Sequence, residues 1–334
     1  MSRKRRPVSS TPGFSETGTR TKDAALAVGL LFPGEYRVAA SSLGVQSVYR
    51  WIQAHPSLAC ERFVLDYQEG SRSMEHGLSP RALPVIAISV AYEPDLFPLL
   101  RWLLANGIPV HARDRGPRDP VLLLGGSVSH GNMRPFLPFV DAAFVGEADD
   151  AQAAIMDAFA RASEGREAVL AALEGIPGIQ RCDGEISTPV AELDHQYAKR
   201  AALPCPGAWT SPAAELSDRF LVEITRGCPD RCHFCVMRHP RGRFRVCSAD
   251  ALFDLDLSPW PKLGLVGAAV SAHPRLKEIL EHFVTRGHQV GLSSLRADVL
   301  DDELAVLLRR AGHRSLTVAA DAPSQVLRDR IEKG

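Results

Sequence analysis

The sequence predicts an α/β protein with two sheet-containing domains. Short apolar runs alternate with stretches of helical periodicity along most of the 334 residues, a pattern typical of parallel strands joined by helices. This length is enough for two domains of ordinary size, each with its own core. Hydrophobic residues make up 45% of the chain and charged residues 23%, which is the balance of a folded globular protein.

The charge and hydropathy patterns exclude several other classes of protein. Lys plus Arg and Asp plus Glu both number 39, so the chain as a whole is not built to coat nucleic acid or an anionic membrane. No apolar run approaches the roughly 18–20 residues of a membrane span. Residues 1–23 are basic and rich in Ser, Thr, Pro and Gly, which predicts a disordered tail rather than a secretory signal. We therefore expect the chain in the reducing cytoplasm, where clustered cysteines serve as ligands before they form disulfides.

The first domain is expected over residues 24–162. Its predicted strands are apolar runs bounded by turn-forming residues: Ala25–Leu31, Arg62–Asp66, Pro84–Ala91, Pro109–Ala112, Val121–Gly125 and Asp141–Val145. Its predicted helices are Leu43–Ala54, Asp95–Asn106 and Asp150–Ala162. This order predicts a doubly wound, mostly parallel sheet. Ser89 and Gly125-Gly126 stand at strand ends, where a glycine either lets the backbone approach a ligand or makes a tight turn.

Residues 163–217 are proline-rich and are expected to form a linker, with a short helix over Glu167–Leu173. The second domain, residues 218–334, opens with the predicted strand Phe220–Thr225. The alternating pattern then resumes, with predicted strands at Leu263–Ala268, His288–Leu292 and Leu316–Ala320 and predicted helices at Pro274–Thr285, Asp301–Arg310 and Ser324–Glu332.

Three cysteines fall within eight residues directly after the strand Phe220–Thr225. Cys228, Cys232 and Cys235 have the spacing C-x3-C-x2-C, on a loop where parallel α/β proteins place their active sites. Three thiolates can bind three irons of a [4Fe–4S] cluster, which leaves the fourth iron without a protein ligand. Such an open metal position is typical of catalytic sites. Phe234 would place an aromatic face beside that iron, suited to packing on an adenine.

Two other interpretations of these cysteines stay open. A zinc site would combine them with His233, His239 or Cys247, although no second C-x2-C pair is present. A cluster used only for electron transfer would call for a fourth cysteine. The remaining cysteines are scattered, and Cys60, Cys182 and Cys205 are predicted to be ordinary packed or surface thiols, whereas Cys247 could lie near the cluster.

This cysteine spacing, with an aromatic residue before the last cysteine and a strand before the first, resembles the signature of the radical S-adenosylmethionine (SAM) superfamily. The resemblance continues in Gly267-Ala268-Ala269, in 293–298 (SSLRAD) and in 316–321 (LTVAAD). It implies that the open iron takes the amino and carboxylate groups of SAM. A one-electron reductant such as a flavodoxin or ferredoxin then drives cleavage of SAM to methionine and a 5′-deoxyadenosyl radical.

The same resemblance implies a set of SAM-contacting residues: Phe234, Gly267, Ser294, Arg296 and Asp321. Two of them have a simpler interpretation that stays open. Arg296 could pair with Asp298 at the surface, and Asp321 could cap the last helix. No catalytic residue and no substrate are predicted.

The first domain resembles the cobalamin-binding-type domain that precedes many radical SAM cores. The resemblance lies in Tyr36-Arg37-Val38, Ser42-Leu43-Gly44, Ala87-Ile88-Ser89, Gly125-Gly126 and Gly146-Glu147. It implies a flavodoxin-like (Rossmann-like) fold whose ligand-facing loops hold Ser89, Gly125 and Gly126. The cobalt-ligating motif D-x-H-x-x-G is absent, since the loop after the first strand is 32–37 (FPGEYR). The domain therefore either binds cobalamin without this histidine or keeps the fold without the cofactor.

The resemblance implies that the second domain is a partial, TIM-barrel-like (β/α) barrel. A complete core of this kind takes about 200 residues, whereas residues 220–334 number 115, enough for four strands. We expect a truncated core, or one completed by a partner or by self-association. The predicted function is that of a radical SAM iron–sulfur enzyme, linked to methyl or group transfer if cobalamin binds. The alternatives are a non-catalytic iron–sulfur or SAM-binding remnant and a zinc-stabilised binding module.

Overall fold

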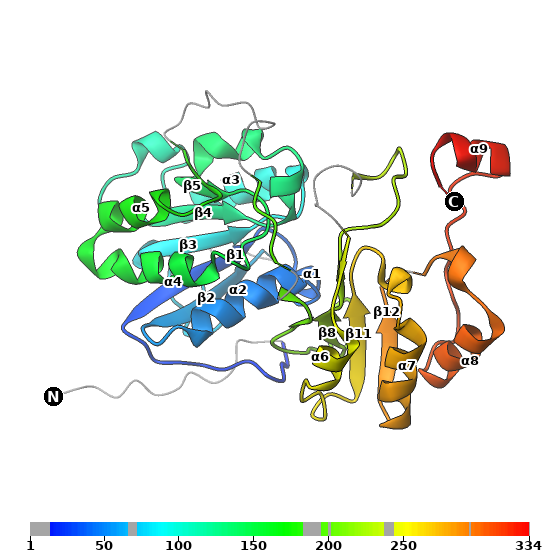
Figure 1. Ribbon diagram of the computed structural model, residues 1–334. Coiled ribbons are helices and arrows are strands. Elements are labelled where there is room, and N and C mark those ends of the chain that lie inside the picture. Colours follow the sequence, from blue (N-terminus) through cyan, green and yellow to red (C-terminus); the bar gives the residue numbers. More distant parts are fainter. Residues whose placement is uncertain are drawn as a thin grey trace. The chain divides into compact units, whose positions relative to one another are not determined.

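A computed structural model describes residues 14–65, 72–182, 195–199, 202–236, 244–293 and 295–333. The chain forms two compact units, the first made of Met1–Gln196 and Ser211–Glu215 and the second of Tyr197–Thr210 and Leu216–Gly334 (Figure 1). Each unit contains a parallel-rich sheet with helices packed on it, so the predicted α/β class is confirmed. Within the described ranges, no helix is long and apolar enough to cross a membrane.

The first unit is built on a six-stranded sheet with the order β2-β1-β3-β4-β5-β6. Its strands are β1 (Leu26–Phe32), β2 (Leu58–Val64), β3 (Val85–Ser89), β4 (Val121–Gly125), β5 (Ala142–Phe144) and β6 (Ile179–Arg181). The first five are parallel, and β6 runs antiparallel to β5. The carboxyl ends of β1 to β5 therefore lie along one edge of the sheet.

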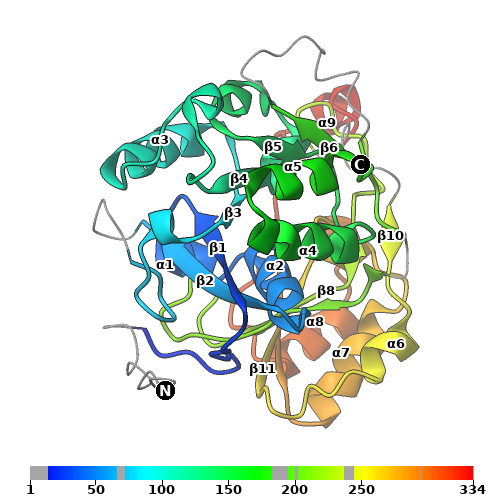
Figure 2. The same cartoon turned by 90° about the vertical axis from the view of Figure 1, so that its left-hand side faces the viewer.

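Helices cover both faces of this sheet. They are α1 (Tyr36–Ala39), α2 (Leu43–Ala54), α3 (Leu96–Ala105), α4 (Gln152–Ala160) and α5 (Arg166–Glu174). In Figure 2, α2, α4 and α5 lie on one face and α3 lies on the other. Ser42 caps α2 by accepting a hydrogen bond from the Val45 amide at 3.4 Å. The core between these layers includes the fully buried Trp102, Phe63 and Phe136.

Most of the predicted elements of the first unit are confirmed, and α2 and β4 have the predicted bounds. The helix predicted over Glu167–Leu173 is α5, which packs in this unit together with β6. The strand predicted at Pro109–Ala112 is wrong. The side chain of Arg115 donates hydrogen bonds to the carbonyls of Pro109 and Val110, so these groups are engaged by a side chain instead of a neighbouring strand.

The second strand begins at Leu58, four residues earlier than predicted. Residues 58–60 pair with 26–28 of β1, and the strand then continues through Glu61 and Arg62. Charged residues are rarely buried, so Glu61 separated the apolar start of this strand, residues 58–60, from the part that the sequence predicted. Both are buried here because each has ionic partners.

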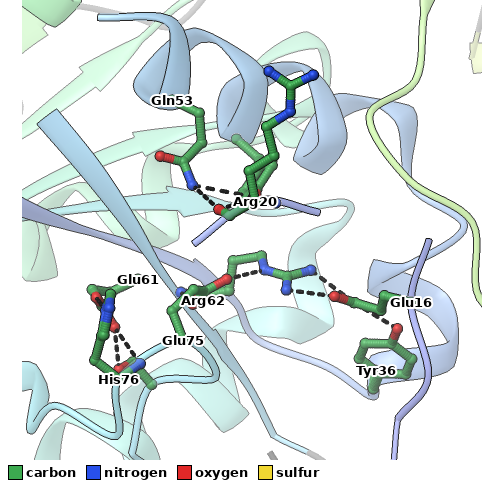
Figure 3. Close-up of polar contacts among 10 residues, drawn as sticks. Glu16, Arg20, Tyr36, Gln53, Glu61, Arg62, Glu75 and His76 are labelled. Atoms are coloured by element: carbon green, nitrogen blue, oxygen red, sulfur yellow. Dashed lines mark hydrogen bonds and ion pairs between the residues drawn. The ribbon is translucent and has the colours of Figure 1, made fainter. Parts of the chain in front are cut away.

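Arg62 lies at the centre of a buried polar network (Figure 3). Its guanidinium donates to both carboxylate oxygens of Glu16, at 2.8 and 2.7 Å, and to Glu75 at 2.5 Å. The Tyr36 hydroxyl donates to Glu16 at 2.7 Å. Beside this network, the buried Glu61 carboxylate contacts His76. A buried charge is tolerated only when it is paired, and all of these are.

The prediction of disorder for residues 1–23 does not hold for residues 14–22. The ring of Phe14 stacks on Tyr36 with centroids 3.8 Å apart, and the Arg20 amide donates to the Tyr49 hydroxyl at 2.9 Å. The Lys22 ammonium donates to the carbonyl of Gln53 at 3.3 Å. Composition alone predicted a tail, but the partners of this segment stand 20 to 46 residues further along the chain.

The second unit contains a four-stranded sheet with the order β12-β11-β8-β7. Its strands are β7 (Cys205–Pro206), β8 (Phe220–Glu223), β11 (Lys262–Val266) and β12 (Gln289–Leu292), of which the last three are parallel. A separate two-stranded sheet pairs β9 (Thr225–Arg226) with β10 (Arg245–Val246). The helices are α6 (Ala249–Phe253), α7 (Leu276–Thr285), α8 (Asp302–Arg310) and α9 (Gln325–Arg330).

The predicted strands and helices of this unit are confirmed up to α8, and the last helix is α9. The strand predicted at Leu316–Ala320 is wrong, because these residues are exposed and form no strand. The edge of β12 is already engaged at Val290, whose amide donates to the Ala311 carbonyl and whose carbonyl contacts His313 Nε2, both at 3.0 Å. β7, β10 and α6 are short elements that the sequence pattern did not predict.

Candidate functional site

The three cysteines lie on the loop between β9 and β10, just past the carboxyl end of β8. The strands on either side of this connection are held together, because Arg226 pairs with Arg245 and the Cys247 amide donates to the Ile224 carbonyl at 2.9 Å. The described part of the connection that carries the thiols, residues 227–236, is called the cysteine loop. Gly227 begins the loop with a φ of 77°, a conformation that favours glycine. The sequence therefore folds into a strand, a tight turn and a loop that presents its thiols at the edge of the sheet.

Cys232 is buried, while Cys228 and Cys235 are partly exposed. The Cys235 amide donates to the Cys232 carbonyl at 3.1 Å, which bends the loop between these two thiols. Burial raises the pKa of Cys228 and of Cys232, and the charge of Asp230 raises both further. Without a metal these thiols are therefore protonated at neutral pH, and a metal that binds them must displace the protons.

The donor set fits an iron–sulfur cluster in its chemistry. Three thiols stand on one loop, and they lie close enough that the charge of Cys235 contributes to the raised pKa of both Cys228 and Cys232. Within the described ranges, no three His, Cys, Asp or Glu side chains are already grouped to hold a metal ion. Binding of a cluster would thus couple to closure of the loop, since preformed metal sites are rare in the absence of the metal.

Of the further zinc ligands that the sequence offered, two make other contacts and the third is not described. His233 Nε2 pairs with Glu332 at 3.2 Å. Cys247 is buried with its Sγ 3.8 Å from His273 Nε2, and His239 lies outside the described residues. Cys60, Cys182 and Cys205 are buried thiols.

Arg296 connects the end of β12 to the cysteine loop. Its guanidinium donates to both carboxylate oxygens of Asp230 at 2.7 Å and to Asp298 at 2.9 and 2.5 Å. Its amide donates to the Ser271 hydroxyl at 3.0 Å. These partners raise the pKa of Arg296, Asp298 contributing most, and hydrogen bonding to Arg296 lowers the pKa of Asp298. The predicted pairing with Asp298 is present, and the arginine also holds the loop.

Gly267, at the end of β11, packs against β9. Its φ is 155°, and a Cβ placed on it would lie 2.2 Å from Thr225 Oγ1 and 2.4 Å from the Thr225 carbonyl oxygen, so only glycine fits. Ser293 donates to the Gly267 carbonyl at 3.0 Å. The Thr225 hydroxyl is buried and has no hydrogen-bond partner among the described residues. Ser294 lies outside the described residues.

The two remaining SAM-contact candidates are Phe234, in the cysteine loop, and Asp321, which precedes α9. Phe234 is 58% exposed, so its ring is free to receive a ligand. Asp321 has a φ of 57° and pairs with Lys333. It does not cap α9, because Ser324 accepts the capping hydrogen bond from the Leu327 amide.

The sequence did not indicate that residues 331 and 332 contact the cysteine loop. The His233 amide donates to the Ile331 carbonyl at 2.9 Å, and the His233 side chain pairs with Glu332. Lys333 follows directly, and its charge influences Cys232. His233 and its partners at 331 and 332 are about 100 positions apart in the sequence. The only sequence signal for this contact is that both segments contain acidic and basic residues.

In the first unit, the candidates Ser89, Gly125 and Gly126 lie together at the ends of β3 and β4, where Ser89 is in register with Gly125. Gly126 has a φ of 100°, and a Cβ on it would lie 2.4 Å from the Val90 carbonyl oxygen. A Cβ on Gly125 would meet no atom of the described chain within 4 Å. Gly126 therefore makes a tight turn, whereas Gly125 leaves room for a ligand.

Two histidines lie near this edge that the sequence did not single out. His130 follows β4, and His195 immediately precedes Gln196, which pairs with Gly146 just past β5. Their rings are stacked with centroids 6.4 Å apart. The Nδ1 of His195 is buried without a hydrogen-bond partner among the described residues. Their separation by 65 positions hid this pair from sequence inspection.

Comparison with known proteins agrees with part of this picture. Residues 44–180 match the family described as "Radical SAM proteins, N-terminal". This segment runs from α2 to β6 in the first unit and does not include the cysteine loop. The match supports membership of the radical SAM superfamily, in which a SAM molecule and an iron–sulfur cluster are the usual cofactors.

The chain also resembles a curated protein, an uncharacterized protein of Methanocaldococcus jannaschii. The two are 24% identical over 320 residues, which is 92% of this chain and 63% of the relative. This chain thus spans less than two thirds of the relative's length, and the similar region includes most of both units.

Proposed function

We propose that this chain is a radical SAM iron–sulfur protein in which Cys228, Cys232 and Cys235 hold three irons of a [4Fe–4S] cluster. The observation that carries the proposal is the placement of three thiols on one loop at the carboxyl end of β8. Soft thiolate ligands of this number favour an iron–sulfur cluster with one open iron. The match of residues 44–180 to the N-terminal region of radical SAM proteins supports the same class.

The arrangement of the two sheets supports the finer fold assignment. In the second unit, β8, β11 and β12 are successive parallel neighbours separated by helices, as in the first part of a (β/α) barrel. In the first unit, the order 2-1-3-4-5 is the flavodoxin-like order. We therefore propose a flavodoxin-like domain and a partial radical SAM barrel, for which the sequence predicted residues 24–162 and 218–334. Within the predicted linker 163–217, α5 and β6 pack in the first unit and β7 pairs with β8.

The residues around the loop have separate roles in this proposal. Cys228, Cys232 and Cys235 would hold the cluster, which would supply one-electron reduction of the SAM sulfonium with a flavodoxin or ferredoxin as the electron source. Phe234 offers its exposed ring to the adenine, and Gly267 lets the end of β11 approach Thr225 closely, directly before the cysteine loop. Arg296 fixes the loop through Asp230, and Ser294 and Asp321 complete the set of SAM contacts.

For the first unit we propose a ligand at Ser89, Gly125 and Gly126. Ligands of open α/β sheets bind at the carboxyl ends of the strands, and Gly125 leaves space there. A corrin at this edge would take no histidine from the loop after β1, since residues 32–37 contain none. Incubation with hydroxocobalamin followed by gel filtration tests this point, because a bound corrin gives the protein fraction a visible absorption band.

Anaerobic reconstitution with iron and sulfide tests the main proposal. The protein should become brown and hold about four irons per chain. Cys232→Ala should lose the colour, and the control Cys60→Ala should keep it, because Cys60 is a buried thiol of β2. One zinc per chain without colour would contradict the proposal and favour a zinc-stabilised binding module.

A second measurement separates an enzyme from a non-catalytic binding protein. The reconstituted chain is given SAM and a strong one-electron reductant, and 5′-deoxyadenosine is measured by chromatography. Formation above the level of Cys232→Ala supports the enzyme. Tight SAM binding without this product supports the non-catalytic alternative.

A further inference from the structure

Two histidine rings lie near each other at the carboxyl edge of the sheet in the first unit. His130 ends the short helical turn that follows β4, and His195 precedes Gln196, which forms a bridge with Gly146 just past β5. The ring centroids are 6.4 Å apart, and the ring planes are inclined by 23°. Both residues are partly exposed, so a small solute can reach them from the solvent.

The position of His130 is set by its neighbour Ser129. The hydroxyl of Ser129 donates to the Gly126 carbonyl at 2.8 Å and accepts a hydrogen bond from the Gly146 amide at 3.2 Å. Ser129 is itself buried. This one side chain therefore joins the turn after β4 to the end of β5, and His130 follows directly on a backbone that is anchored at two points.

His195 is brought to the same edge by the backbone of Gln196. The Gln196 amide donates to the Val145 carbonyl at 3.1 Å, and its carbonyl accepts from the Glu147 amide at 2.9 Å. The approach is so close that a Cβ on Gly146, whose φ is 103°, would lie 2.2 Å from the Gln196 carbonyl oxygen. Only glycine fits there, so the end of β5 is suited to holding His195 at the edge of the sheet.

One ring nitrogen of His195 lacks the partner that a buried polar atom normally has. Its Nδ1 is buried and has no hydrogen-bond partner among the described residues. Most buried polar atoms are paired, because a buried nitrogen that has lost its bond to water without a replacement lowers stability. A metal ion can supply that partner, since neutral imidazole is the commonest protein ligand of transition metals.

The spacing of the two rings suits one shared ion. Imidazole nitrogens lie about 2.0–2.1 Å from zinc, so two rings on one ion have centroids about 5–6.5 Å apart. The observed separation of 6.4 Å is at the upper end of this range. Within the described ranges, no three His, Cys, Asp or Glu side chains are grouped around an ion. The pair would therefore supply two ligands, and water or another small molecule would supply the rest.

We propose that His130 and His195 form a binding site for a divalent transition-metal ion, with one ring nitrogen from each histidine as a ligand. The remaining positions of the ion are then available to a molecule bound at this edge, where Gly125 leaves room because a Cβ there would meet no described atom within 4 Å. The site belongs to the first unit, whereas the cysteine loop belongs to the second. It is therefore independent of the iron–sulfur cluster.

Nickel binding to the full chain tests this inference by titration calorimetry. The parent protein for the assay carries Cys228→Ser, Cys232→Ser and Cys235→Ser, so that the thiols of the cysteine loop cannot take up the ion. It should bind one Ni²⁺ per chain. His130→Gln and His195→Gln should each weaken this binding at least about ten-fold, because loss of a direct ligand should cost no less than loss of a group that orients one.

The matched control is His111→Gln. His111 is another partly exposed histidine of the first unit, and its ring lies against Phe139 with centroids 5.1 Å apart. This variant should bind nickel as tightly as the parent. Circular dichroism of each variant shows whether its fold is kept, so that a loss of binding is not mistaken for a loss of structure.

A crystal of the parent soaked in nickel chloride locates the ion without any change at the histidines. Anomalous difference density between the rings of His130 and His195 is the expected result. A parent that binds no nickel, density only at other places, or equal affinity of the parent and both histidine variants would overturn the inference. The assay contains neither iron nor SAM, so its failure leaves the proposed cluster untouched, and a wild type that takes up no iron leaves this site untouched.

Discussion

The two units hold their arginines in contrasting ways. In the first unit, the side chain of Arg62 is 7% exposed, and its partners Glu16 and Glu75 are buried as well. In the second unit, Arg296 bridges Asp230 and Asp298 with 28% of its side chain exposed. A buried charge needs its partner at all times because water cannot replace it. A partly exposed arginine can exchange a carboxylate for water at little cost.

The buried ion pairs of the first unit fix its structure, whereas the partly exposed pairs around the cysteine loop allow local rearrangement. The first unit repeats the buried arrangement at Asp141, which pairs with both Arg115 and Arg166. Around the cysteine loop the ion pairs all have partly exposed members: Asp230 with Arg296, His233 with Glu332, and Lys333 with Asp321. Contacts of the second kind can open locally, which a loop must do if it is to admit a cluster and a nucleotide.

The contrast predicts its largest effect at Arg62. Arg62→Met leaves the carboxylates of Glu16 and Glu75 buried without their cation, so the free energy of unfolding of the first unit should fall by about 3–5 kcal/mol. Chemical denaturation followed by circular dichroism measures this change. The matched variant Arg296→Met should cost less than about 1 kcal/mol, because both of its partners can be solvated. Similar losses for the two variants would break the comparison.

Regular elements of both units could be predicted from the sequence because their signals are local. The cap at Ser42 and the apolar spacing of Leu43–Ala54 define α2, and the uninterrupted apolar run of β4 is bounded by glycine. The errors arose where a side-chain contact decides the structure. Arg115 engages the carbonyls of Pro109 and Val110 while it pairs with Asp141, 26 positions further along, and hydrophobic periodicity does not encode these contacts.

The same holds for the contacts around the candidate site. The spacing of Cys228, Cys232 and Cys235 and the preceding apolar run located the loop, because both are properties of neighbouring residues. The ion pair between Asp230 and Arg296 joins positions 66 apart, and the contact of His233 with Ile331 joins positions still further apart. Such contacts depend on how strands and helices pack, which sequence periodicity does not encode.

A smaller loss of stability is predicted for a substitution at Gly267, which lies beside the cysteine loop. Gly267→Ala adds a methyl group 2.2 Å from Thr225 Oγ1 at a φ of 155°, so the end of β11 must shift. The expected loss in the free energy of unfolding is about 2–4 kcal/mol, from backbone strain and overpacking together. Denaturation of the second unit provides the measurement.

The control for this variant is Gly287→Ala. Gly287 also has a positive φ, of 87°, but a Cβ there meets no described atom within 4 Å. It should cost only the backbone strain, about 1 kcal/mol. If both variants lose the same free energy, the close approach of Gly267 to Thr225 has no energetic consequence, and the packing of these two strand ends is looser than described.

The smallest effect concerns pH and the edge of β12. Burial lowers the pKa of His313, whose Nε2 contacts the Val290 carbonyl at 3.0 Å. The unfolded chain takes up a proton near the ordinary pKa of about 6.5, while the folded chain resists it. The stability that this histidine contributes is therefore present above about pH 7 and is lost as the pH falls through 6.5 toward the folded pKa.

Between about pH 7.5 and 5.5, the wild type should lose more stability than His313→Gln, by less than about 1 kcal/mol. Paired denaturation curves measure this difference, and His282, whose pKa burial also lowers, is present in both proteins and cancels. Identical pH dependence would mean that this edge tolerates a charge as readily as the pairs around the cysteine loop do.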